Sequence, residues 1–369
     1  MFKGKLDVNF DALGRLLRPK APPLIGVDIS SSAVKFVELE DAGRGKFRIE
    51  RYVIEPLMKD AVVDGNILNL DQVSDSFKRG WKKLNSRVRN VALALPTAAV
   101  ITKKISVPAG QREDELELQV ETEANQYIPF ALEEVNLDFQ VLGPSPTSPD
   151  DVEVLIAASR KEKVEDRVAA AEAAGLKAIV VDVESYATQA AFDLIAKSLP
   201  EGGQDQTIAI VDVGTSVMNV NILRNGESVY LREQPFGGQQ LTQEIQRHFG
   251  LTADEAEVAK RNGGLPENYE AEVLQPFMDN LALEVARVLQ FFYTSTQYSS
   301  VDKLLLAGGC AAIPDLDETV SRRTQVPTVV ANPFSEMEVS SKIRPRQLQM
   351  DAPSLMVACG LALRRFDPA

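Results

Sequence analysis

Residues 26–39 read GVDISSSAVKFVEL, in which one aspartate and three serines separate two apolar stretches. The β-branched residues on both sides of the serines predict two strands joined by a tight turn. A turn of small polar residues also lets backbone N–H groups and hydroxyls point at one anion. Taken alone, the segment is more simply a serine-rich hairpin than a phosphate-binding loop.

A second stretch repeats this pattern 184 residues later, at residues 209–223, AIVDVGTSVMNVNIL. Asp28 aligns with Asp212, and Ser32 aligns with Ser216. A repeat of this length is too long for a solenoid and predicts two related lobes. Two facing hairpins could hold a triphosphate from both sides, and each aspartate could hold Mg²⁺, usually through water. The repeat therefore favours the phosphate-binding interpretation of both turns.

The composition excludes several classes of protein. The 369 residues carry a net charge of −13, which argues against a nucleic-acid-binding surface. Two cysteines give no disulfide framework and fit a reducing compartment, and a single histidine excludes a histidine-rich metal site. No stretch approaches the roughly 20 apolar residues that cross a bilayer.

Changes in pattern along the chain predict its organisation. Residues 1–23 form a basic, weakly amphipathic leader, which is either a frayed end or a helix for an anionic membrane surface. An acidic segment at 112–138 holds nine acidic residues against one basic residue and belongs to a small α+β insertion. A polar, glycine-containing join precedes the second lobe. The predicted parts are a first-lobe core at 24–86, 161–205 and 350–369, an insertion at 87–160, and a second lobe at 206–349.

Further segments suit a nucleotide between the lobes. The glycine pairs Gly308-Gly309, after a buried strand, and Gly237-Gly238, before a helix, allow a base, sugar or phosphate to approach the backbone. Each is also compatible with a routine turn. Glu284 and Arg287 lie three apart on one helix, a spacing that is more common for a surface ion pair. No GxxxxGK[ST] loop and no GxGxxG helix start offers a competing nucleotide motif.

These features together resemble the actin and sugar-kinase superfamily, whose phosphate motifs match the two hairpins. The segments LAGGCAAIP, VVDVESYATQAA and PSLMVACGLALR are similar to the adenosine motif and the two connecting helices. Within the superfamily, LIGVDISSSAVKFVEL, ETEANQYIPFALEEVNLDF and GGQQLTQEI are very like segments of the PilM family of type IV pilus assembly proteins. The resemblance covers residues 24–366 and implies an α/β, actin-like fold of duplicated RNase H-like lobes, with an insertion subdomain in the first lobe as in FtsA.

The resemblance also implies a function, which is ATP binding with Mg²⁺ by a cytoplasmic protein that associates peripherally with the inner membrane. Its partners would be the N-terminal cytoplasmic peptide of PilN, held between the insertion and the first lobe, and pilus motor ATPases and the platform protein. The residues implied at the phosphates and Mg²⁺ are Asp28, Ser30, Ser31, Ser32, Asp212, Gly214, Thr215 and Ser216. Those implied at the sugar and base are Gly237, Gly238, Glu284, Arg287, Gly308 and Gly309. The two metal-facing carboxylates would be Asp28 and Asp212.

Turnover of ATP is a separate question. Glu184 matches the position of the group that orients the attacking water in other ATPases of the superfamily, or it shapes the Mg²⁺ shell. Lys35, on the second strand of the first hairpin, could reach a phosphate, although a solvent-facing strand lysine is the simpler interpretation. The expectation is a nucleotide-binding protein with at most weak ATPase activity.

Two alternatives remain open. One is a phosphotransferase such as a carbohydrate kinase, although no carboxylate outside the phosphate motifs is a convincing base for a substrate hydroxyl. The other is a membrane-associated filament former like FtsA, which an amphipathic tail after the second lobe would favour. The chain ends LRRFDPA, which offers no such pattern.

Overall fold

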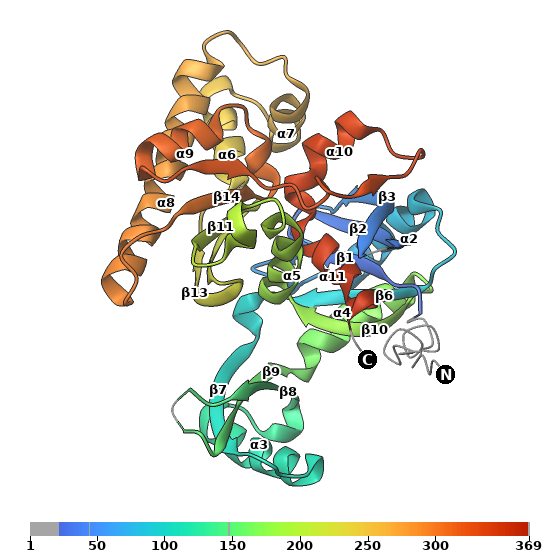
Figure 1. Cartoon of the computed structure of the whole chain (residues 1–369). Coiled ribbons are helices and arrows are strands. Elements are labelled where there is room, and N and C mark those ends of the chain that lie inside the picture. Colours follow the sequence, from blue (N-terminus) through green and yellow to red (C-terminus); the bar gives the residue numbers. More distant parts are fainter. Residues whose placement is uncertain (1–21, 44, 147, 368–369) are drawn as a thin grey trace, which may run out of the picture.

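The computed structural model describes residues 22–43, 45–146 and 148–367 and shows two α/β lobes with a smaller part attached to one of them (Figure 1). The predicted leader at 1–23 lies outside the described residues, apart from its last two positions. The predicted two-lobed α/β architecture with an α+β insertion is confirmed.

The first lobe is built on a six-stranded sheet of order β10-β6-β1-β2-β3-β16. Its strands are β1 Ile25–Ile29, β2 Ala33–Gly43, β3 Lys46–Pro56, β6 Asn90–Leu95, β10 Lys177–Val183 and β16 Glu338–Val339. Its helices are α2 Leu70–Leu84, α4 Lys161–Ala173, α5 Glu184–Ala196, α10 Pro345–Asp351 and α11 Met356–Leu363, and β4 Val62–Val63 pairs with β5 Asn66–Ile67. The apolar residues of α2 and α4 pack on one face of the sheet, and those of α5 and α11 pack on the other.

The second lobe has a five-stranded sheet of order β13-β12-β11-β14-β15. Its strands are β11 Thr207–Val213, β12 Met218–Arg224, β13 Glu227–Gln234, β14 Lys303–Ala307 and β15 Thr328–Val330. Its helices are α6 Gly238–Phe249, α7 Ala253–Asn262, α8 Gln275–Ser295 and α9 Leu316–Thr324, with a π-helical turn at Glu270–Leu274 before α8. Short 3₁₀ turns occur at Thr97–Ala99, Leu132–Glu134, Pro200–Gly203, Gly309–Ala312, Ala352–Leu355 and Arg364–Phe366.

The two lobes repeat the same topology, as the sequence repeat predicts. In each lobe an antiparallel hairpin opens the sheet, and the first strand of that hairpin also pairs in parallel with a later strand. Asp28 pairs with Lys35 across the first hairpin, and Asp212 pairs with Asn219 across the second. The two aspartates therefore occupy equivalent positions, each near the end of a central strand.

The insertion is a three-stranded sheet of order β7-β9-β8 with one helix packed against it. Its elements are β7 Ile101–Pro108, α3 Glu113–Tyr127, β8 Val135–Pro144 and β9 Asp151–Arg160. The predicted start at residue 87 differs from this arrangement, because β6 pairs with β1 and β10 in the first-lobe sheet. The sheets therefore place the start of the insertion after β6, at β7.

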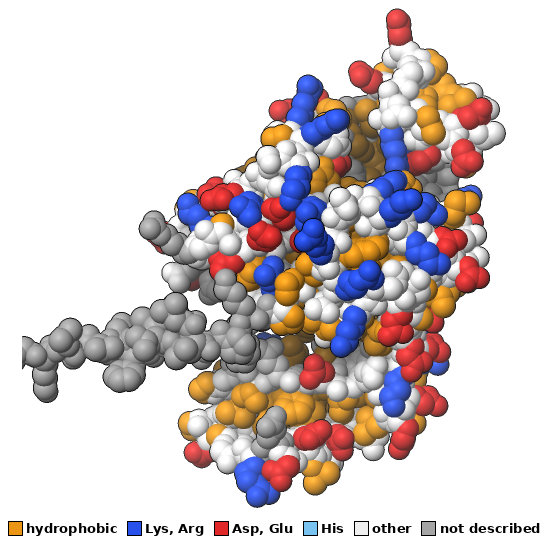
Figure 2. Space-filling view, turned by 90° about the vertical axis from the view of Figure 1, so that its right-hand side faces the viewer, with side chains coloured by type: hydrophobic (Ala, Val, Ile, Leu, Met, Phe, Trp, Pro, Cys, Tyr) orange, Lys and Arg blue, Asp and Glu red, His pale blue; other side chains and the backbone are white. Residues whose placement is uncertain are grey.

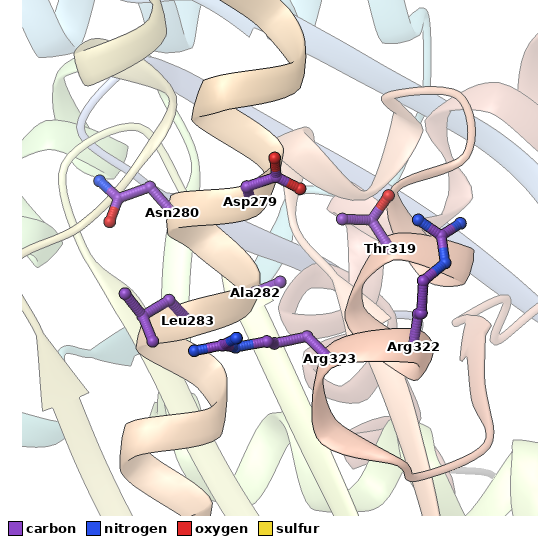
Figure 3. A pocket seen from close by; sticks show the side chains of 7 residues that line it. All are labelled: Asp279, Asn280, Ala282, Leu283, Thr319, Arg322 and Arg323. Carbon is purple, nitrogen blue, oxygen red and sulfur yellow. The ribbon is translucent and has the colours of Figure 1, made fainter.

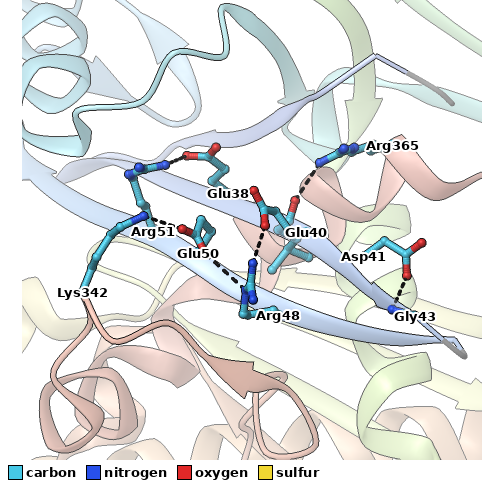
Figure 4. A network of polar contacts seen from close by, with 10 residues as sticks. Glu38, Glu40, Asp41, Gly43, Arg48, Glu50, Arg51, Lys342 and Arg365 are labelled. Atoms are coloured by element: carbon cyan, nitrogen blue, oxygen red, sulfur yellow. Dashed lines mark hydrogen bonds and ion pairs between the residues drawn. The ribbon is translucent and has the colours of Figure 1, made fainter.

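The segment before α10 joins the first lobe, although the sequence places it in the second lobe, which is predicted to extend to residue 349. β16 pairs with β3, and the Lys342 ammonium forms an ion pair with the buried Glu50 carboxylate of β3 (Figure 4). A second ion pair, from Arg51 of β3 to Glu38 of β2 at 3.0 Å, lies beside it in the same sheet. Residues 338–351 are thus attached to the first-lobe sheet.

Helices α5 and α11 pack between the two sheets so closely that two glycine positions there have no room for a side chain. An added Cβ on Gly360 of α11 would lie 1.7 Å from the carbonyl oxygen of Ala187 in α5, and one on Gly26 of β1 would lie 2.0 Å from the carbonyl oxygen of Ala358. One apolar cluster joins α5 and α11 to both sheets. The small residues of α11 therefore let it pack closely against α5 and β1.

Within the described residues, no helix is both long enough and apolar enough to cross a membrane.

Candidate functional site

The two polar turns meet at the interface of the lobes. Ser30–Ser32 join β1 to β2, and Gly214–Ser216 lie between β11 and β12. The Thr215 Oγ1 hydroxyl donates a hydrogen bond to Ser32 Oγ over 2.8 Å. The hairpins that the sequence repeat pairs as equivalent are thus also in direct contact.

A cleft of about 1180 Å³ opens at this contact and continues to the insertion. Thirteen of the residues expected around a nucleotide line it, namely Asp28, Ser30, Ser31, Ser32, Lys35, Glu184, Asp212, Gly214, Thr215, Ser216, Gly238, Gly308 and Gly309. Gly237 lies directly behind the second turn, where an added Cβ would be 2.4 Å from the Thr215 carbonyl oxygen.

Lys35 points into the cleft rather than to solvent. Its Nζ forms an ion pair with Asp28 Oδ2 at 2.9 Å, and Asp28 is only 4% exposed. Burial opposes the charged ammonium, but the carboxylates of Asp28 and Asp212 outweigh burial and raise the pKa of Lys35. Lys35 is therefore a fixed cation beside the first turn.

Asp212 is the carboxylate best suited to a metal ion. Its side chain has no hydrogen bond or ion pair to any described residue. Burial outweighs the attraction of Lys35 and, with repulsion from Asp28, raises the pKa of Asp212 to about 6. A cation would stabilise such an unpaired carboxylate, and oxygen ligands are what Mg²⁺ prefers. Asp28 is already neutralised by Lys35. Of the two aspartates, Asp212 is therefore the one whose carboxylate is left free to meet a cation, whereas the Asp28 carboxylate is occupied by Lys35.

Glu184 begins α5 and lies among the same charges. Burial, followed by repulsion from Asp28, raises its pKa to about 8, although Arg167 counteracts the shift. The side chain is thus mostly protonated at neutral pH. A protonated carboxyl donates a hydrogen bond but does not accept a proton from water.

Arg167 supports the cleft wall from behind without lining the cleft, and the sequence does not predict this role. It is 1% exposed and donates from Nε to the Ala94 carbonyl over 2.9 Å and from Nη2 to the Gly65 carbonyl over 2.7 Å. It thereby joins α4, which follows the insertion directly, to the strand end and turn beside the cleft. A lone arginine in an alanine-rich helix carries no sequence signal of this burial.

Gly308 ends β14 at a position that only glycine suits. Its φ of 83° and ψ of 176° lie in a region that side-chain-bearing residues rarely adopt. An added Cβ would lie 2.4 Å from the Val213 carbonyl oxygen and 2.6 Å from Asp212 Oδ1. Because Gly308 has no side chain, the space next to the Asp212 carboxylate stays open. Gly309, by contrast, has open space where its Cβ would be.

Glu284 and Arg287 do not reach the cleft. They form an ion pair with each other on α8, which is the alternative that their spacing favours. Near them, between α8 and α9, lies a separate hollow of about 610 Å³, across which Arg323 of α9 extends toward Leu283 of α8 (Figure 3). Neither Glu284 nor Arg287 lines that hollow.

Among the helices of the second lobe, the charged residues that line the cleft come from α7 and not from α8. Glu257, Lys260 and Arg261 line it, and Lys260 Nζ donates to Thr242 Oγ1 over 2.7 Å and pairs with Glu257 at 2.6 Å. Their i, i+3, i+4 spacing is visible in the sequence. That pattern is usually a surface ion pair, so it gives no reason to choose α7 before the fold is known.

The other end of the cleft lies against the insertion. Figure 2 shows the molecule hollowed where the insertion meets the main body. This end is lined by apolar residues of the insertion and by Arg160, whose guanidinium lies 5.4 Å from the centre of the Phe130 ring. The lining residues here include Ile101, Ile128, Pro129, Phe130, Val135 and Ala158. One continuous cleft therefore has a charged end between the lobes and a largely apolar end beside the insertion.

Comparison with known proteins identifies relatives over almost the whole chain. A family model described as type IV pilus assembly protein PilM matches residues 26–366. Among solved structures, the chain is similar to one from a PilM-PilN type IV pilus biogenesis complex, with 28% identity, a TM-score of 0.78, and coverage of 95% of this chain and 100% of that chain.

More distant structures share the fold. The ethanolamine utilization protein EutJ from Carboxydothermus hydrogenoformans has 15% identity and a TM-score of 0.54, over 94% of this chain and 91% of that one. A diol dehydratase-reactivating factor in nucleotide-free form has 9% identity and a TM-score of 0.54, over 94% and 100% of the two chains. With the pilus protein, these neighbours confirm the actin-like, two-lobed fold.

Proposed function

The chain belongs to the PilM family of type IV pilus assembly proteins, and we propose that it is an ATP-binding adaptor that captures the cytoplasmic N-terminal tail of PilN. The observation that carries this proposal is the similarity, over 95% of this chain and 100% of the other, to the protein of the PilM-PilN complex. The cleft supports it, because one cavity offers both a phosphate-binding end and an apolar end beside the insertion.

The charged end suits ATP with Mg²⁺. The turns at Ser30–Ser32 and Gly214–Ser216 would present N–H groups and hydroxyls to the phosphates. Lys35 would add a positive charge to the first turn, and Asp212 would hold the metal ion, which neutralises phosphate charge when it is bound. On the second-lobe side of this charged end, Lys260 and Arg261 of α7 would border the sugar and base, together with Gly308 and Gly309.

The apolar end suits the tail of PilN. The insertion residues there enclose a groove, and the Arg160 guanidinium lies over the Phe130 ring in it. A short extended segment with apolar side chains would bury them in this groove, and a polar atom of the segment would meet the guanidinium. Capture of the tail would keep the protein at the inner membrane, at its cytoplasmic surface.

Binding of nucleotide is better supported than its hydrolysis. A group that activates water must accept its proton, and Glu184 is mostly protonated at neutral pH because burial raises its pKa to about 8. We therefore assign the chain at most weak ATPase activity. Pilus motor ATPases and the platform protein would be further partners of the captured complex.

The decisive experiment is a calorimetric titration of the full chain with a synthetic peptide of the PilN N-terminal tail, without nucleotide and with ATP and Mg²⁺. The proposal expects saturable binding and loss of ATP binding in Asp212→Ala. Arg287→Ala, outside the cleft, is the matched control and should behave as the wild type. Absence of peptide binding by the wild type in both conditions would overturn the proposed role.

A further inference from the structure

Two buried polar atoms in the wall of the cleft lack a partner. Ser185 Oγ and Asn221 Nδ2 have no hydrogen-bond partner among the described residues, although Ser185 is 7% and Asn221 5% exposed. Both residues line the cleft. A buried polar group without a hydrogen bond is costly and uncommon. In the wall of a cavity, such atoms mark the place where a ligand completes the hydrogen bonding.

The two atoms belong to opposite walls. Asn221 lies opposite Ile210 in the β11–β12 ladder, and Ile210 packs with Phe192 of α5 in one apolar cluster. Ser185 precedes Phe192 by two helical turns and so lies on the same side of α5. The inner face of the second-lobe sheet thus carries Asn221, and the facing first-lobe helix carries Ser185.

This part of the cleft lies between its two ends. Ser185 follows Glu184, which belongs to the charged end, and precedes Tyr186, which is hydrogen-bonded to Thr102 of β7 in the insertion. On the other wall, Leu231 of β13 lies opposite Asn221 and also lines the cleft. A chain that enters beside the insertion therefore meets these residues before it meets the phosphate turns.

The available atoms select a neutral amide. Asn221 Oδ1 already accepts a hydrogen bond from Ser228 Oγ over 2.7 Å, which leaves its Nδ2 as a donor. The Ser185 hydroxyl can accept or donate. An amide offers one carbonyl and one N–H group and thus satisfies both side chains. A charged group would be less suitable here, because neither Ser185 nor Asn221 carries an opposite charge to neutralise it in this buried wall.

We propose that the captured tail extends past the insertion groove and that one of its amide groups hydrogen-bonds to Ser185 and Asn221 together. This inference rests on the proposed function, because it assigns a second contact to the same bound segment. The two residues belong to different lobes, so the tail is held by both. Any ligand that changes the distance between the lobes then changes the affinity for the tail.

The test measures peptide affinity by calorimetry for the wild type, Ser185→Ala and Asn221→Leu. Each variant should weaken binding by about 5- to 20-fold, the loss expected for one buried hydrogen bond. Tyr230→Phe is the matched control, because the Tyr230 hydroxyl is also buried without a partner but does not line the cleft. Its peptide affinity should equal that of the wild type.

A second measurement separates a direct contact from a change in folding. Peptides that are N-methylated at one backbone amide at a time are titrated into the wild type and into Ser185→Ala. At one position, methylation should weaken binding to the wild type. The same methylation should have little further effect on binding to Ser185→Ala, which already lacks the hydroxyl. If the wild type binds the peptide and both cleft variants bind it equally well, the atoms bind only water and the inference is wrong. If the wild type does not bind the peptide, the proposed function itself fails.

Discussion

Thr215 donates a hydrogen bond to Ser32 over 2.8 Å, and this bond joins two turns that lie in different lobes. Both hydroxyls belong to the groups proposed to face phosphates. A phosphate that enters between the turns must therefore replace this bond with bonds of its own. The contact holds the lobes together only while the phosphate position is free.

A double-mutant cycle of Thr215→Val and Ser32→Ala tests this relationship. Without nucleotide, the two changes should be non-additive in the free energy of unfolding by about 0.5–1.5 kcal/mol, because either one removes the same hydrogen bond. With saturating ATP and Mg²⁺ the coupling should fall toward zero. Urea unfolding in the two conditions gives both values, and coupling that is unchanged by ATP would contradict the assignment of the turns.

Protonation of Asp212 should limit metal-dependent nucleotide binding. Its pKa of about 6 means that the carboxylate is charged above that pH and neutral below it. The affinity for ATP with Mg²⁺ should therefore decrease as the pH falls below about 6, whereas Asp212→Asn should bind weakly at every pH. Titrations between pH 5 and pH 8 with Mg²⁺, and with EDTA as the control, measure this dependence. A flat profile for the wild type would exclude Asp212 as the metal ligand.

Glu184 should make the unliganded protein less stable at higher pH. Its folded-state pKa of about 8 lies above the ordinary value of 4.5, so between these values the folded state binds more protons than the unfolded state. The free energy of unfolding from this group therefore falls as the pH rises through that window. Glu184→Gln should raise the free energy of unfolding at pH 8 by about 1–3 kcal/mol relative to the wild type, with little gain at pH 4.5. Equal effects at both pH values would contradict the raised pKa.

Adjacent glycines at the end of β14 should respond differently to alanine. Gly308→Ala places a Cβ 2.4 Å from the Val213 carbonyl oxygen at a φ of 83°, so we expect a loss of about 2 kcal/mol or more in the free energy of unfolding. Gly309→Ala meets nothing within 4 Å, and its effect should stay within about 0.5 kcal/mol. Chemical denaturation of both variants measures the contrast. Similar values for the two would show that the backbone at Gly308 relaxes freely.

A comparison of variants in α7 and α8 can show which helix borders the sugar and base of the nucleotide. Lys260→Met removes the ammonium that lines the cleft, and ATP affinity should fall by about tenfold, the loss expected for one charge-assisted contact. Arg287→Met, on α8, removes an arginine that pairs with Glu284 outside the cleft and should not change the affinity. Fluorescence titration with an ATP analogue distinguishes them. The reverse result would restore Glu284 and Arg287 to the nucleotide site.

The sequence predicts those parts of the site whose signals are local. The repeated Asp28 and Asp212 hairpins are recognisable because strand alternation and turn composition lie within fifteen residues. The sequence prediction places β6 in the insertion, whereas β6 belongs to the first-lobe sheet. A buried apolar strand has the same sequence pattern whichever sheet it joins.

The sequence places Glu284 and Arg287 of α8 at the nucleotide, whereas residues of α7 line the cleft. Charge pairs with i, i+3 spacing on two helices look alike in sequence, and only the fold shows which pair lies near the cleft. Burial of Ser185 and Asn221 without a partner has no sequence signal at all.

The contact between Gly360 and Ala187 has a consequence for how the two halves of the molecule move. With an added Cβ only 1.7 Å from the Ala187 carbonyl oxygen, no side chain can be accommodated between α11 and α5. These helices lie between the sheets and cannot separate without exposing their shared apolar surface. Any change that widens the cleft and preserves this surface therefore has to keep α5 against α11. A side chain at position 360 would push the two helices apart, so its first effect would be on the packing that joins the two lobes.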